Sequence, residues 1–114
     1  MEPIMYIFLN KGVKMSKGKS AVQAAHAAVL AYKISEFKAR EEWDCGSFTK
    51  ILLCAENEKH IQNIQTYLEQ NEINSVSVND EGRTEIAPNT LTALGVEILN
   101  DEDKINVLKT FKLY

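Results

Sequence analysis

The sequence predicts an α/β domain in which helices pack on a mostly parallel or mixed β-sheet. Two observations predict this class. Short apolar runs alternate along the chain with longer segments of helical periodicity. The composition is that of an ordinary globular protein, with 45% hydrophobic and 25% charged residues in a chain of 114. A chain of this length can close one core, so we expect a single domain over residues 1–114.

The first 55 residues contain two expected strands and the longest expected helix. Ile4 to Leu9 is a continuous apolar run, typical of a strand buried on both faces. Residues 10–18 have the composition of a loop. Good helix formers then run from Lys19 to Arg40 without Gly or Pro, which predicts one long helix. After Gly46, the segment Phe48 to Ala55 predicts a second buried strand.

The central part predicts a second helix and a third strand. Ile61, Ile64 and Leu68 recur at helical spacing, as in a helix lying on a sheet. Ser75 to Val78 alternates with period two and predicts a strand. Residues 79–82 then have the composition of a turn, and residues 84–90 are expected to be extended and loop-like because Pro88 disfavours helix in the residue before it.

The remaining residues predict one more strand and a short helix. Leu91 to Leu99 is expected to form a strand interrupted at Gly95. Asn100 or Asp101 can cap a last helix through Lys109. The last four residues are expected to return as a short edge strand, and an exposed edge there could pair with a second copy of the chain.

Charge is distributed unevenly along the chain. The formal net charge is −3, which argues weakly against nucleic-acid binding. Residues 1–40, however, hold seven of the 13 Lys and Arg against only Glu2 and Glu36, so this part carries +5 and the remainder −8. A molecule polarised in this way can present one face to phosphate although it is acidic as a whole.

Several classes of protein are disfavoured by composition. No apolar run approaches the roughly 18 residues that span a bilayer, and the first residues do not resemble a signal peptide, so we expect a cytoplasmic protein without a membrane partner. Cys45 and Cys54 are too few and too unpatterned for a disulfide framework or a four-ligand zinc site. We therefore expect reduced thiols and no metal.

Candidate functional side chains gather on the first helix. Lys19, Gln23 and His26 lie at i, i+4 and i+7, so one face would align an ammonium, an amide and an imidazole. A lysine at a helix start lies near the positive end of the helix dipole, which invites an anionic partner. The alternative is a solvated lysine with a hydrogen-bonded core histidine, and for His26 alone this alternative is the better one.

A second group of candidates follows the third strand. Asp80 could orient a water or a base, with Arg83 beside it, and Thr84 could donate to a developing oxyanion. Thr90 and Thr92 add hydroxyl groups nearby. The alternative is an aspartate that only caps its own turn.

The segment Gly18-Lys19-Ser20, between a strand and a helix, also suggests a phosphate-binding P-loop. That motif requires a glycine five positions before Gly18, where this chain has Val13, and Gly12 is one residue too early. Nucleotide binding is therefore a third-ranked hypothesis.

Two blocks of the sequence resemble a known family. Residues 14–28, Lys-Met-Ser-Lys-Gly-Lys-Ser-Ala-Val-Gln-Ala-Ala-His-Ala-Ala, are similar to the signature of the type 2 peptidyl-tRNA hydrolases. Residues 80–90 resemble the aspartate-x-glycine-arginine-threonine loop of that family, and Leu94-Gly95 follows at the matching position. Trp43, Lys50 and the last four residues also fit the family's order.

The resemblance implies a fold, an activity and a site. The fold is a four-stranded mixed sheet with helices packed on both faces. The activity is hydrolysis of the ester that joins a peptide to the 3′ end of tRNA, with tRNA as partner and no metal or organic cofactor. Catalytic roles would fall to Lys19, Asp80 and Thr84. Substrate-binding or supporting roles would fall to Lys14, Lys17, Gln23, His26, Arg83, Thr90 and Thr92.

One segment departs from the family. After the first strand the family usually carries arginine-x-aspartate-leucine, whereas this chain has Asn10, Lys11, Gly12 and Val13. This departure supports a second hypothesis, in which the chain is a non-catalytic member of the family that binds RNA or protein.

Overall fold

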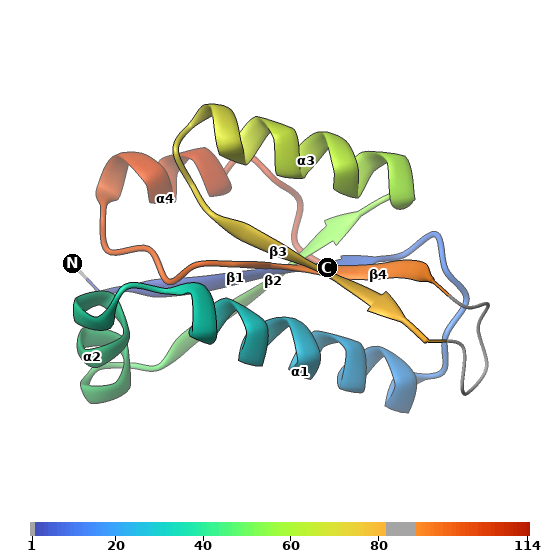
Figure 1. Ribbon diagram of the computed structural model, residues 1–114, viewed down its shortest axis with the longest axis horizontal. Helices are drawn as coiled ribbons and strands as arrows, with labels where there is room; N and C mark the ends of the chain where they lie inside the picture. The colour runs from blue at the N-terminus through green and yellow to red at the C-terminus, as the bar shows by residue number, and fades with distance from the viewer. Residues whose placement is uncertain (1, 82–88) are drawn as a thin grey trace.

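The computed structural model describes residues 2–81 and 89–114 as one mixed four-stranded sheet with helices on both faces, which confirms the predicted α/β class (Figure 1). The strands are β1 (Ile4–Asn10), β2 (Thr49–Ala55), β3 (Ser75–Asp80) and β4 (Thr90–Val96), in the order β2-β1-β4-β3. β1 is parallel to β2, and β4 is antiparallel to both β1 and β3. The predicted third strand therefore continues two residues beyond Val78, through Asn79 and Asp80.

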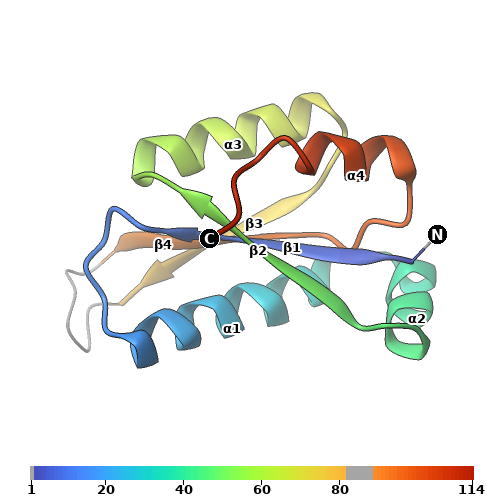
Figure 2. The ribbon, with the colours of Figure 1, turned by 180° about the vertical axis from the view of Figure 1, so that it is seen from behind.

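The helices form two layers. α1 (Lys17–Ile34) and α2 (Phe37–Cys45) lie on one side of the sheet, and α3 (Glu58–Gln70) and α4 (Glu102–Leu108) lie on the other, as both views show (Figures 1 and 2). Among the residues that the structure describes, no helix is both long and apolar enough to span a bilayer.

The two faces of the sheet are packed differently. Large apolar side chains fill the face under α3 and α4, among them Phe8, Leu53 and Leu94. On the other face, α1 presents small side chains such as Ala27 and Ala31 to the sheet, and this allows the helix to lie very close to β4. A Cβ atom at Gly95 would collide with the carbonyl oxygen of Ala27. The predicted interruption at Gly95 is thus wrong: β4 runs through this glycine, and its missing side chain makes room for α1.

The prediction of one helix from Lys19 to Arg40 is also wrong. α1 ends at Ile34, and α2 begins at Phe37. Between them, the buried hydroxyl of Ser35 donates to the carbonyl of Ala31 at 2.7 Å and accepts from the backbone N–H of Ile98 at 2.8 Å. This tertiary contact with the segment after β4 fixes the break, which local helix propensity could not reveal.

The C-terminal segment differs slightly from the prediction. β4 ends at Val96 rather than Leu99, and Asp101 caps α4 through its side chain. The last residues form an isolated bridge to β2 rather than a full strand. The backbone N–H of Cys54 donates to the carbonyl oxygen of Lys112 at 2.8 Å, and the backbone N–H of Tyr114 donates to the carbonyl oxygen of Leu52 at 3.0 Å. The chain's own tail therefore lies along the outer edge of β2.

Candidate functional site

The first turn of α1 places Lys19. Ser16 is the N-cap of the helix, and its hydroxyl accepts a hydrogen bond from the backbone N–H of Lys19 at 3.1 Å. This contact satisfies one of the N–H groups that a helix start leaves without a partner. The helix begins two residues before the predicted start at Lys19, and the signal for its cap was a serine just before a helical segment, which is a usual N-cap residue.

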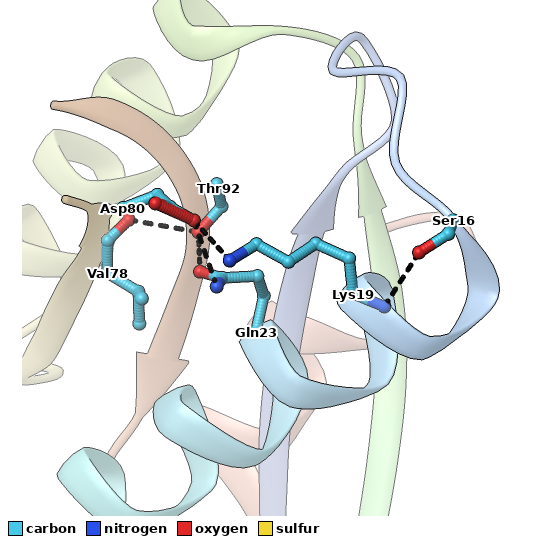
Figure 3. A network of polar contacts seen from close by, with 6 residues as sticks. All are labelled: Ser16, Lys19, Gln23, Val78, Asp80 and Thr92. Atoms are coloured by element: carbon cyan, nitrogen blue, oxygen red, sulfur yellow. Dashed lines mark hydrogen bonds and ion pairs between the residues drawn. The ribbon is translucent and has the colours of Figure 1, made fainter. Parts of the chain in front are cut away.

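Lys19 reaches from α1 to the end of β3. Its Nζ atom lies 2.6 Å from Oδ2 of Asp80, and the two side chains are only 13% and 4% exposed. The two residues are 61 positions apart in sequence, but the elements that carry them are adjacent in the fold (Figure 3). A buried carboxylate and ammonium in this arrangement form a charge-assisted contact largely shielded from water.

Two further side chains support the Asp80 carboxylate. Gln23, one turn after Lys19, is 2% exposed, and its Nε2 lies 3.5 Å from Oδ2 of Asp80. The fully buried Thr92 donates its hydroxyl proton to Oε1 of Gln23, and its Oγ1 also lies 3.3 Å from the carbonyl oxygen of Val78. Because the amide oxygen of Gln23 is engaged by Thr92, its NH₂ group is directed toward Asp80 (Figure 3).

A β-bulge brings Thr92 into this network. Val78 pairs with Ala93, but the next residue of β3, Asn79, pairs with Leu91, so Thr92 is an extra residue in β4. Ala93 packs under α1 and Leu91 packs on the opposite face with α3, while the hydroxyl of Thr92 contacts Gln23 of α1. The bulge therefore turns two successive side chains toward α1, as bulges beside functional sites commonly do.

The remaining predicted residues are exposed on or near α1, lie beside Asp80 in the sheet, or fall outside the described part. Lys14 and Lys17 are exposed near the start of α1, and Thr90 is half-buried opposite Asp80 at the start of β4. His26 is exposed on α1, so the alternative of a core histidine is wrong. Arg83 and Thr84 fall outside the described residues, as do Gly82 of the predicted turn and residues 84–88 of the predicted loop.

The arrangement is suited to chemistry on a carbonyl group. The carboxylate of Asp80 is a hydrogen-bond acceptor that can orient water, and the ammonium of Lys19 can stabilise an oxygen that gains negative charge. No group of three or more His, Cys, Asp or Glu side chains that could hold a metal occurs within residues 2–81 and 89–114. The P-loop hypothesis needs Lys19 for phosphate, whereas this lysine is paired with Asp80.

Comparison with known proteins identifies the family. The sequence profile described as Peptidyl-tRNA hydrolase PTH2 matches residues 4–114. The chain belongs to the PTH2 family. A relative from Thermococcus onnurineus, named peptidyl-tRNA hydrolase, is 38% identical over 92 residues, which cover 77% of each chain. A relative of the same name from Haloquadratum walsbyi is 30% identical over 102 residues, covering 90% of this chain and 91% of the relative.

PTH2 relatives also occur in animals. The protein named peptidyl-tRNA hydrolase 2, mitochondrial, from Bos taurus is 34% identical over 95 residues, covering 81% of this chain and 53% of that protein. The PTH2 match extends over all four strands and all four helices described above, including Lys19, Gln23, Asp80 and Thr92.

Proposed function

We propose that this PTH2 member hydrolyses the ester between a peptide, or an N-blocked aminoacyl group, and the 3′ end of tRNA. The products are a free peptide carboxylate and a tRNA with its terminal ribose hydroxyl restored. The observation that carries this proposal is the enclosed pair of Lys19 and Asp80, supported by Gln23 and Thr92, in a chain that matches the family along its length.

The proposed division of roles follows from charge. Asp80 orients the attacking water, because an ionised carboxylate only accepts hydrogen bonds. Lys19 stabilises the negative oxygen of the tetrahedral intermediate, together with Thr84. An aminoacyl ester is already activated, so a positioned water and one stabilised oxyanion are sufficient chemistry.

The tRNA contacts are proposed on the basic part of the chain. Lys14 and Lys17 are exposed on the loop before α1 and on its first residue, close in sequence to Lys19. We assign them to backbone phosphates of tRNA, whose negative charge the N-terminal end of α1 also attracts. Thr90, Arg83 and His26 are proposed to assist substrate binding.

The oligomeric state and the cellular location stay predictions. A homodimer through an exposed sheet edge would need β3 or the tail on β2, and sedimentation velocity at several concentrations tests it. A cytoplasmic location is expected from the sequence, whereas the Bos taurus relative is named mitochondrial, so fractionation of the source cells is the relevant measurement.

The experiment that tests the proposed activity is hydrolysis of N-acetyl-aminoacyl-tRNA by the purified protein, with and without a metal chelator. We expect cleavage that the chelator does not abolish, and slow or no cleavage of the unblocked aminoacyl-tRNA. A folded protein that binds tRNA but leaves the ester intact at high enzyme concentration would instead support the non-catalytic hypothesis.

A further inference from the structure

The side chain of Asn10, at the end of β1, lies where the backbone pairing between β1 and β4 has ended. β1 and β4 pair as far as Leu9 and Ala93, while β1 remains paired with β2 through Asn10 and Ala55. The bulge at Thr92 lies directly before Ala93 in sequence. Residues 90–92 of β4 therefore have no backbone partner in β1. Leu91 is nevertheless buried, at 6% exposure, and a buried carbonyl needs a donor.

Asn10 supplies that donor. Its side chain is 2% exposed, and Nδ2 donates to the carbonyl oxygen of Leu91 at 2.8 Å. The other half of the amide, Oδ1, accepts from the backbone N–H of Gly12 at 2.8 Å. With both halves engaged, the amide has one orientation, and it ties the turn after β1 to the start of β4.

Gly12 is part of the same unit. A Cβ atom at this position would lie 2.6 Å from the carbonyl oxygen of Glu56 and 3.1 Å from Oδ1 of Asn10. The turn therefore folds back onto Asn10 and onto the segment after β2 only because residue 12 has no side chain. Asn10 and Gly12 fit one another as a pair.

Asn10 and Gly12 are connected to the Lys19–Asp80 pair through the backbone of β4. Leu91, which Asn10 holds, immediately precedes Thr92, and Thr92 donates to Gln23, whose amide faces Asp80. On the other side, Thr90 pairs with Asp80 in the sheet register. Movement of Leu91 would displace both the hydroxyl that orients Gln23 and the backbone opposite Asp80.

We propose that Asn10 is a positioning residue for the hydrolytic centre. By its hydrogen bond to Leu91 it fixes the β4 bulge, so that Thr92 and Gln23 hold the Asp80 carboxylate in place. This inference rests on the proposed function. It also changes the interpretation of the segment that departs from the family. Asn10 and Gly12 contact one another and stabilise this end of β1 in place of the usual family residues, so the departure does not by itself indicate a loss of activity.

The test is the variant Asn10→Asp, which keeps the side-chain shape and an oxygen for Gly12 but removes the N–H donors to Leu91. We expect kcat for N-acetyl-aminoacyl-tRNA to fall by roughly tenfold to a hundredfold at neutral pH, with KM almost unchanged, because small displacements of catalytic groups cost about this much. The matched control is Asn71→Asp, which removes a similar amide contact, 2.9 Å to the carbonyl of Tyr67 at the end of α3. Its kcat should equal that of the parent.

A pH series separates positioning from a general loss of stability. When protonated, the carboxyl group introduced by Asn10→Asp can again donate to Leu91, so the ratio of its kcat to the parent's should rise as the pH is lowered. Circular dichroism at each pH establishes that both proteins are folded. A ratio that stays constant across the series would overturn the proposal.

A spectroscopic measurement keeps the test independent of turnover. The side-chain NH₂ resonances of Gln23 in a ¹⁵N-correlated NMR spectrum should shift in Asn10→Asp and remain in place in Asn71→Asp. If the Asn10→Asp protein does not fold, Gly12→Ala, whose Cβ atom would press on the carbonyl oxygen of Glu56 and on Oδ1 of Asn10, should also shift these resonances. Unmoved Gln23 resonances contradict the positioning role. A parent without hydrolytic activity contradicts the proposed function, and the NMR result then decides the positioning role alone.

Discussion

The Nζ atom of Lys19 lies 2.6 Å from Oδ2 of Asp80, and this contact joins the first turn of α1 to the last residue of β3. Removal of one residue from such an enclosed pair leaves the other charge without its ion-pair partner, which commonly costs more stability than the intact pair provides. Variants of either residue therefore need a measurement of folding beside every measurement of activity.

Thr92→Val should reduce catalysis with little change in substrate affinity. Valine has nearly the same shape but cannot donate to Gln23, so the Gln23 amide loses the contact that orients it toward Asp80. We expect kcat to fall about tenfold or more, in line with misplacement of a catalytic group. Steady-state kinetics of the variant test this. Thr66→Val, which removes an exposed hydroxyl contact on α3, is the control and should have the parental kcat; equal rates for all three proteins would contradict the prediction.

Replacement of Lys14 and Lys17 together by alanine should weaken tRNA binding in a salt-dependent way. The slope of log K against log salt concentration is negative, and each phosphate contact that is lost should reduce its magnitude by about one. The measurement is the dissociation constant for tRNA at four or more salt concentrations. Lys59→Ala, on α3 at the opposite face of the sheet, should leave the slope unchanged. The phosphate assignment fails if the double variant has the parental slope.

The sequence predicted the fold class and the positions of the elements because apolar runs and helical periodicity are local patterns. It also predicted Lys19, Asp80, Gln23 and Thr92 as candidates, and the structure brings these four together. It could not predict the break at Ser35, since the partners of that hydroxyl include Ile98, 63 residues away.

The bulge at Thr92 was equally invisible in the sequence. A strand with an extra residue has the same local composition as one without it, and only pairing with β3 reveals the shift between Val78 and Asn79. The sequence marks Asn10 only as the replacement of a family residue. Its role requires knowledge of the carbonyl of Leu91, which lies 81 residues away in sequence.

Ser35→Ala should destabilise the fold without affecting the reaction. The variant leaves the buried N–H of Ile98 without its acceptor, at a cost of about 1–3 kcal/mol in the free energy of unfolding. Urea denaturation followed by circular dichroism measures this cost. Ser47→Ala, at an exposed serine before β2, is the matched control. A Ser35→Ala protein as stable as the control would show that the contact does not determine the break between α1 and α2.

We propose that Lys19 and Asp80 act as one catalytic unit, and a double-mutant cycle on the rate of ester cleavage tests this most directly. Single-turnover rates and tRNA dissociation constants are measured for the parent, Lys19→Ala, Asp80→Asn and the double variant, all checked for folding. We expect each single variant to lose about a hundredfold or more in rate but little in binding, and the double variant to lose no more than the slower single variant. Rate losses that multiply, or losses in binding as large as those in rate, would contradict the account.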